Sequence, residues 1–114
     1  AKTTAARTLA SAHTAFIRQS AVAGLHDAAG RRYPLQAPAT RIGRLADNDI
    51  VLDDDEVSRY HAVIVDTGSS FMIIDLRSAN GVLVQGRRLH PSATLADGDH
   101  IRICGHEFTF ELRP

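Results

Sequence analysis

Short apolar runs separated by turn residues recur from residue 22 to the end of the chain. The runs at 62–66 and 71–76 are almost continuously apolar, which is typical of strands covered on both faces. The run at 106–112 alternates instead, so that Phe108, Phe110 and Leu112 share one side of a strand. Many short strands at close spacing predict an all-β fold, either a sandwich or a barrel.

Turn residues divide the rest of this region into further strands. Gly30 can take a positive φ, which predicts a hairpin between the runs on either side of it. Pro34 has no N–H to donate to a sheet, so the strand at 31–36 is expected to be an edge strand or a distorted one. The remaining predicted strands cover 22–27, 40–43, 50–52, 82–84, 87–89 and 100–104.

Residues 1–20 have a different composition from the strands that follow. They are rich in alanine and contain no glycine or proline, which favours a helix. One apolar stripe at helical spacing is formed by Ala5, Leu9, Ala12 and Phe16. We therefore predict a helical or linker segment at 1–20 and one folded domain at 21–114. A partner contact or a weak homodimer through Leu9, Phe16 and Ile17 is the alternative for this segment.

The chain has 114 residues, which fits one domain, and its formal net charge is zero. Zero net charge argues against direct nucleic-acid binding, which depends on neutralising phosphates, although a local basic patch stays open. The single cysteine, Cys104, cannot form an internal disulfide, and its surroundings predict a packed, unreactive thiol. No apolar run is long enough to cross a bilayer, and no signal-peptide pattern is present. We expect a cytoplasmic domain without membrane contact.

Polar residues with binding chemistry stand where predicted loops meet predicted strands. They are the pair Gly43-Arg44, the motif Ser58-x-x-His61 and the segment 78–81, which reads Ser-Ala-Asn-Gly. Loops held by a rigid sheet are common places for binding residues. An arginine and a hydroxyl are suitable donors for a phosphate group, so these loops predict a phosphate-recognition surface.

In this order the three motifs resemble the forkhead-associated (FHA) domain. The resemblance covers 22–112 and implies an eleven-stranded β-sandwich that binds phosphothreonine peptides through loops at one end. Within the FHA family, the segments at 61–68, 76–82 and 98–110 resemble most specifically the FHA domains of mycobacterial transcription regulators. That similarity implies signalling downstream of bacterial Ser/Thr kinases, with phosphothreonine-containing proteins, kinases or kinase substrates as partners.

The resemblance also implies a role for each matching residue. Arg44 would hold the phosphate with its guanidinium group, and Ser58 would donate a hydrogen bond from its hydroxyl. Arg59 would contribute its backbone N–H or its charge. Asn80 would bond the peptide backbone beside the phosphothreonine, since its amide both donates and accepts.

Three further residues are expected to support the site. Gly43 and Gly81 would allow close backbone approach or a positive φ. His61 would brace the Ser58 loop through internal hydrogen bonds rather than contact the ligand.

One position departs from the FHA pattern. Many FHA domains carry Thr or Ser before the asparagine, whereas this chain has Ala79. Ser78 stands one residue earlier and would reach the phosphate only if the loop turned it inward. The missing hydroxyl would weaken binding and keeps open a phosphate-independent scaffold that works through the N-terminal segment or a sheet edge.

Other functional classes fit the sequence poorly. Ser58 and His61 lack the glycine-rich elbow of a serine nucleophile, so we do not expect an enzyme. The six histidines are scattered and form no metal-binding motif. The acidic stretch 47–56 lacks the required glycine and the closing bidentate glutamate of a calcium loop. The acidic run 53–56 is predicted to be solvated, as are the side chains of Arg41 and Arg77. We expect no cofactor.

Overall fold

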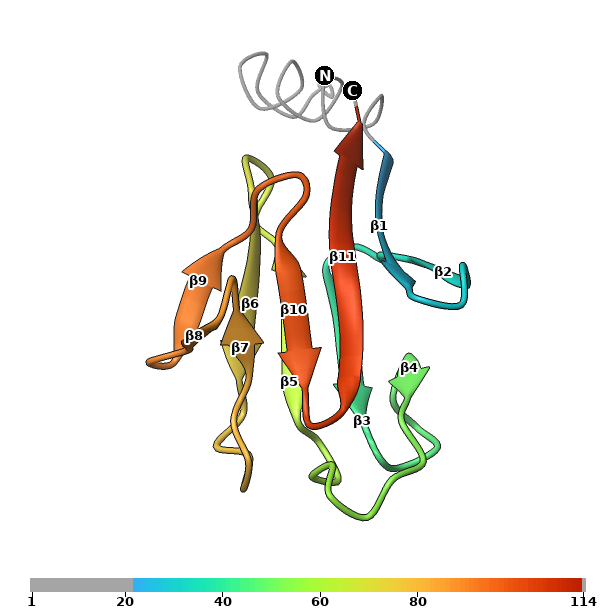
Figure 1. Ribbon diagram of the computed structural model, residues 1–114. Coiled ribbons are helices and arrows are strands. Elements are labelled where there is room, and N and C mark those ends of the chain that lie inside the picture. The colour runs from blue at the N-terminus through green and yellow to red at the C-terminus, as the bar shows by residue number, and fades with distance from the viewer. Residues whose placement is uncertain (1–21, 114) are drawn as a thin grey trace.

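The computed structural model describes residues 22–113. In this range eleven strands form two sheets that pack as a β-sandwich (Figure 1). One sheet has the order β2 (Arg32–Pro34), β1 (Val22–Asp27), β11 (His106–Arg113), β10 (His100–Ile103), β7 (Leu83–Val84) and β8 (Arg87–Arg88). The other has the order β4 (Ile50–Val51), β3 (Ala39–Gly43), β5 (Ala62–Asp66), β6 (Phe71–Asp75) and β9 (Ser92–Thr94). The all-β prediction is confirmed, and the segment at 1–20 lies outside the described residues.

The strand pairing follows the sequence signals closely. All described pairs are antiparallel except β3 with β4, which run parallel. Gly30 has a φ of 84° in the turn between β1 and β2, as a hairpin there requires. β2, which contains Pro34, is an edge strand. The short strand β9 was not predicted, because its Ser-Ala-Thr sequence has no apolar pattern.

The core lies between the two sheets. On β11, Phe108 and Phe110 are buried while Thr109 and Glu111 are partly exposed, which confirms the predicted alternation. The prediction that both faces of the strands at 62–66 and 71–76 are covered is wrong. Ala62 and Ile64 are buried, but the residues between and after them on β5 are partly exposed. A two-layer sandwich covers only the inner face of each sheet.

The buried core extends into the loops at one end of the sandwich. This end, at the bottom of Figure 1, carries the loops β3–β4, β4–β5, β6–β7 and β10–β11. Ile42 and Val82 are 0% exposed and Val57 is 1% exposed. Each of these three stands one or two residues from a predicted binding residue, so the apolar core fixes the loop positions. No helix in the described part of the chain is long and apolar enough to cross a bilayer.

Replacing Phe110 tests the predicted core. Phe110 is 0% exposed and its ring centroid lies 5.7 Å from that of Phe71 on the opposite sheet. Phe110→Ala is expected to lower the free energy of unfolding by about 3–5 kcal/mol, because it leaves a cavity. Thr109→Ala, on the other face of β11, should cost about 1 kcal/mol or less. Urea unfolding of both variants measures this, and equal losses would contradict the assigned strand register.

Candidate functional site

Arg44 directly follows β3 and its side chain is tied to the β4–β5 loop. Its backbone N–H donates to the carbonyl of Ser58 at 3.1 Å. Its Nε donates to the carbonyl of Val57 at 3.0 Å. In the part of the chain that the structure describes, the two terminal nitrogens make no hydrogen bond. They are therefore free to donate a parallel pair of bonds to an anion.

His61 joins Ser58 to the β6–β7 loop. Its Nδ1 accepts a hydrogen bond from the Ser58 backbone N–H at 3.0 Å. An accepting nitrogen carries no proton, so the ring is the neutral tautomer with its proton on Nε2. Nε2 then donates to the carbonyl of Gly81 at 2.8 Å. With an exposed fraction of 0%, the His61 side chain is buried between these two loops and links them.

The Ser58 hydroxyl forms a second link to the β6–β7 loop. Its Oγ accepts a hydrogen bond from the backbone N–H of Ala79 at 3.0 Å. The hydroxyl proton remains available to a ligand, because this bond uses only a lone pair. The His61 ring faces the Ser58 backbone N–H and not its Oγ, so the two residues do not form a nucleophile and base pair.

Ser78 is used mainly within its own loop. Its Oγ accepts from the N–H of Gly81 at 2.9 Å, and its own N–H donates to Oδ1 of Asp75 at 3.0 Å. These two bonds close the turn that presents residues 79 and 80. The Ser78 hydroxyl proton stays unused within residues 22–113, although the oxygen is committed to the turn.

Asn80 lies across the β4–β5 loop. Its Nδ2 donates to the backbone carbonyl of Glu56 at 2.8 Å. The same carbonyl accepts a hydrogen bond from the Cys104 thiol at 3.1 Å. The Asn80 side chain is exposed, and its Oδ1 has no partner among the described residues, so it is available to accept from a peptide N–H.

Cys104 is partly buried, and most of the acidic run 53–56 is exposed. Burial raises the pKa of the Cys104 thiol, and the nearby carboxylates of Asp54 and Glu56 raise it further, so the thiol is protonated and unreactive. Hydrogen bonds from the Glu56 N–H and from the His106 ring lower the pKa of Asp54. His106 Nε2 lies 2.9 Å from Asp54 Oδ2, which ties the acidic run to the β10–β11 turn.

Gly43 and Asn48 allow the β3–β4 and β4–β5 loops to lie in contact. A Cβ at residue 43 would lie 2.3 Å from the carbonyl oxygen of Arg59, so only glycine fits. Asn48 is 6% exposed, and its Nδ2 donates to the carbonyls of Leu45 at 2.8 Å and Arg59 at 2.9 Å. Asn48 was missed in the sequence, where it reads as an ordinary turn residue.

At residue 81, both the backbone conformation and the lack of space for a side chain favour glycine. Its φ is +80°, and a Cβ there would lie 2.8 Å from Nε of Arg88.

The Arg59 side chain is exposed and makes no hydrogen bond within the described residues. The structure thus brings Arg44, Ser58, Ser78 and Asn80 into one network of loops, while only the backbone of Arg59 belongs to it.

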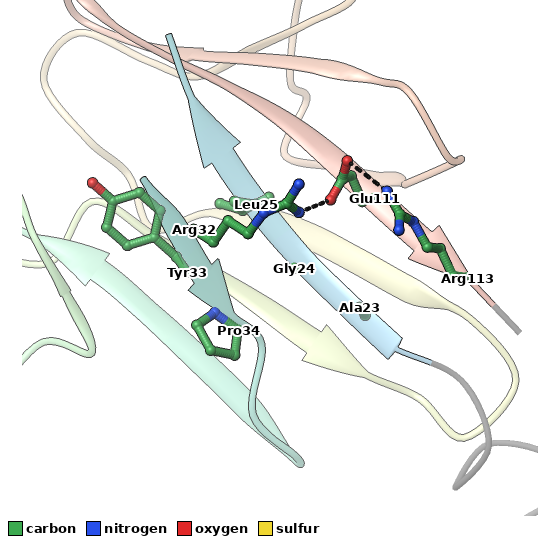
Figure 2. A pocket seen from close by; sticks show the side chains of 8 residues that line it. All are labelled: Ala23, Gly24, Leu25, Arg32, Tyr33, Pro34, Glu111 and Arg113. Carbon is green, nitrogen blue, oxygen red and sulfur yellow. Dashed lines mark hydrogen bonds and ion pairs between the residues drawn. The ribbon is translucent and has the colours of Figure 1, made fainter. Parts of the chain in front are cut away.

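A separate hollow of about 200 Å³ lies on strands β1, β2 and β11, away from these loops (Figure 2). Its polar side chains are already paired, since Arg32 and Arg113 both contact the carboxylate of Glu111. The hydrogen bond from Arg32 lowers the pKa of Glu111. Both arginines of this hollow therefore already have a counter-charge in Glu111. No cluster of three or more metal-ligating side chains occurs within residues 22–113.

Comparison with known proteins identifies the family. Residues 40–104 match the family profile of the FHA domain. The chain belongs to the FHA domain family. It is also similar to the transcriptional regulatory protein EmbR of Mycobacterium tuberculosis, with 64% identity over 115 residues that cover 98% of this chain. The chain spans 30% of the length of EmbR.

Solved structures agree with this assignment. EmbR of Mycobacterium tuberculosis, in complex with a low-affinity phosphopeptide, matches with a TM-score of 0.79 and 61% identity, over 88% of this chain and 29% of that chain. An FHA domain studied for phosphothreonine-dependent interactions matches with a TM-score of 0.76 and 35% identity, over 82% of this chain and 98% of that chain. The predicted FHA family, sandwich fold and resemblance to a mycobacterial regulator are confirmed.

The contact between Gly43 and Arg59 in this FHA domain is open to a direct test. Gly43→Ala is expected to lower the free energy of unfolding by about 1–3 kcal/mol, because the added methyl group collides with a backbone oxygen. Gly105→Ala is the matched control, since a Cβ at residue 105 meets nothing within 4 Å. It should change stability by about 0.5 kcal/mol or less. Urea unfolding compares the two, and equal stability would show that the β3–β4 and β4–β5 loops are not in contact.

Proposed function

We propose that this domain binds phosphothreonine-containing protein segments in bacterial Ser/Thr kinase signalling. The observation that carries the proposal is the arrangement of free donors at the loop end. Within residues 22–113 the terminal nitrogens of Arg44 and the hydroxyl proton of Ser58 are unused, and hydrogen bonds to Val57 and from Ala79 hold the two side chains in place. A phosphothreonine brings about −1.5 to −2 charges and three acceptor oxygens, which match these donors.

The remaining residues divide between peptide contact and support. Asn80 would bond the peptide backbone through its free Oδ1, and Arg59 would add positive charge from the rim. Ser78 would contribute its hydroxyl proton only, because its oxygen accepts from Gly81. Gly43, His61 and Gly81 would keep the loops in register without touching the ligand.

The similarity to EmbR supports the choice of ligand, since EmbR has been solved with a phosphopeptide. We propose phosphorylated kinases or their substrates as partners in the cytoplasm, with no direct contact to nucleic acid. FHA domains are binding modules, so we propose a binding role and no catalysis. A homodimer through the N-terminal segment stays a prediction, since Leu9, Phe16 and Ile17 lie outside the described residues.

A second candidate function is phosphate-independent scaffolding. The observation that favours it is Ala79, whose methyl group stands where many FHA domains place a hydroxyl. Losing one charge-assisted hydrogen bond weakens binding by about 1.5–3 kcal/mol. Under this alternative, partners would bind a sheet edge or the N-terminal segment with equal affinity in phosphorylated and unphosphorylated form.

Removing the Arg44 side chain separates the two functions. Arg44→Ala is expected to weaken binding of a phosphothreonine peptide by about tenfold or more, because at least one charge-assisted bond is lost. Isothermal titration calorimetry with the phosphorylated peptide and its unphosphorylated twin measures this. Arg41→Ala, which removes a nearby exposed arginine, serves as the control and should change affinity by about twofold or less. Equal weak heats in every titration would overturn the phosphopeptide proposal.

Restoring the missing hydroxyl should strengthen binding. Ala79→Thr is expected to tighten binding by about tenfold, because the new hydroxyl can donate to a phosphate oxygen. Ala79→Val has nearly the same shape without the hydroxyl and should give no gain. The same calorimetry compares both variants. A Thr variant no tighter than the Val variant would show that residue 79 does not face the phosphate.

A further inference from the structure

A second pocket borders the β6–β7 loop, next to the site proposed for phosphothreonine. Its volume is about 480 Å³. Its lining comes from the β6–β7 loop and from the segment that follows β7, and its polar members are Asp75, Arg77, Ser78, Arg88 and His90. Ser78 belongs to this pocket and also closes the turn that presents Ala79 and Asn80. The two sites therefore share one loop.

The pocket carries unpaired positive charge. Arg77, Arg88 and His90 are exposed, and none of their side chains makes a hydrogen bond or ion pair within residues 22–113. The only carboxylate in the lining is that of Asp75, and its Oδ1 already accepts the Ser78 N–H at 3.0 Å. The pocket lining thus contains two guanidinium groups and one partly occupied carboxylate, and this excess of positive charge favours binding of an anion.

Arg88 is placed close to the proposed peptide path. A Cβ at Gly81 would lie 2.8 Å from its Nε and 2.9 Å from its Cζ, so the guanidinium packs on the Gly81 backbone. Gly81 directly follows Asn80, the residue proposed to bond the peptide backbone. An extended peptide held by Asn80 advances roughly 3.3 Å per residue, so its neighbouring side chains come within reach of this pocket.

We propose that this pocket binds a second anionic side chain of the same peptide, either a second phosphorylated residue or a carboxylate. The proposal rests on the proposed phosphothreonine binding, because Arg44 and Ser58 would set the register of the peptide. Arg88 and Arg77 provide the charge-assisted hydrogen bonds, and His90 adds a ring nitrogen. The preferred ligand is then a segment with two anionic groups a few residues apart.

Calorimetry with a peptide series tests this pocket. The series contains one singly phosphorylated peptide and peptides with a second phosphothreonine placed two to five residues away on either side. A parallel set carries glutamate at the second position, which separates phosphate from carboxylate recognition. At least one doubly phosphorylated peptide is expected to bind tenfold tighter than the singly phosphorylated one. The glutamate peptide of the same spacing should show a smaller gain.

Variants assign the gain to named residues. Arg88→Ala and the Arg77→Ala/Arg88→Ala double variant should remove the gain and leave affinity for the singly phosphorylated peptide within twofold. Arg88→Gln keeps most of the side-chain length against Gly81 and should lose the gain equally, which separates charge from packing. Arg87→Ala is the control, because Arg87 neighbours Arg88 on β8 but does not line the pocket.

The outcomes distinguish the two proposals. If the singly phosphorylated peptide binds but no second anion tightens binding, the pocket proposal is overturned and the proposed function stands. The same holds if the gain survives in the Arg77/Arg88 double variant or is lost equally in Arg87→Ala. If no phosphorylated peptide binds at all, both proposals are overturned.

Discussion

The binding end of this domain depends on one buried imidazole. His61 accepts a hydrogen bond from the Ser58 N–H and donates one to the Gly81 carbonyl, and both partners are backbone groups. It therefore sets the distance between the loop that would grip phosphate and the loop that would hold the peptide. A buried polar group without a partner costs about 1–3 kcal/mol, so an apolar residue here would leave two such losses and release both loops. The neutral tautomer is required, because a second ring proton would face the Ser58 N–H.

Around this brace the loops are fixed by apolar anchors and by shared carbonyl acceptors. Ile42, Val57 and Val82 hold the chain in the core immediately beside the residues that face solvent. The Glu56 carbonyl accepts from both Asn80 and Cys104, so the asparagine amide is oriented before any peptide arrives. Such preorganisation lowers the entropy lost on binding. In the proposed site, this would partly offset the loss of the hydroxyl that many FHA domains carry at the position of Ala79.

Much of this arrangement was predictable from local patterns. The alternation on β11, the edge position of Pro34 and the strand-end motifs of Arg44, Ser58 and Asn80 each follow from period or turn chemistry. Asn48 could not be found this way, because one of its bonds reaches the carbonyl of Arg59 on another loop, which only folding brings near. The same is true of the hydrogen bond that the backbone N–H of Ala79 donates to the hydroxyl oxygen of Ser58. The half-exposed outer face of β5 was missed, because apolar residues on both faces suggest full coverage.

A two-dimensional amide NMR titration of the wild-type domain with a phosphothreonine peptide would locate the binding surface directly. The amide signals of Arg44, Ser58, Arg59, Ala79 and Asn80 should shift together with one binding curve. Signals from β1, β2 and β11 should stay in place, and the unphosphorylated peptide should leave the loop signals unchanged. Shifts confined to the sheet edges, or equal shifts with both peptides, would contradict the central claim that the loops braced by His61 form a phosphothreonine site.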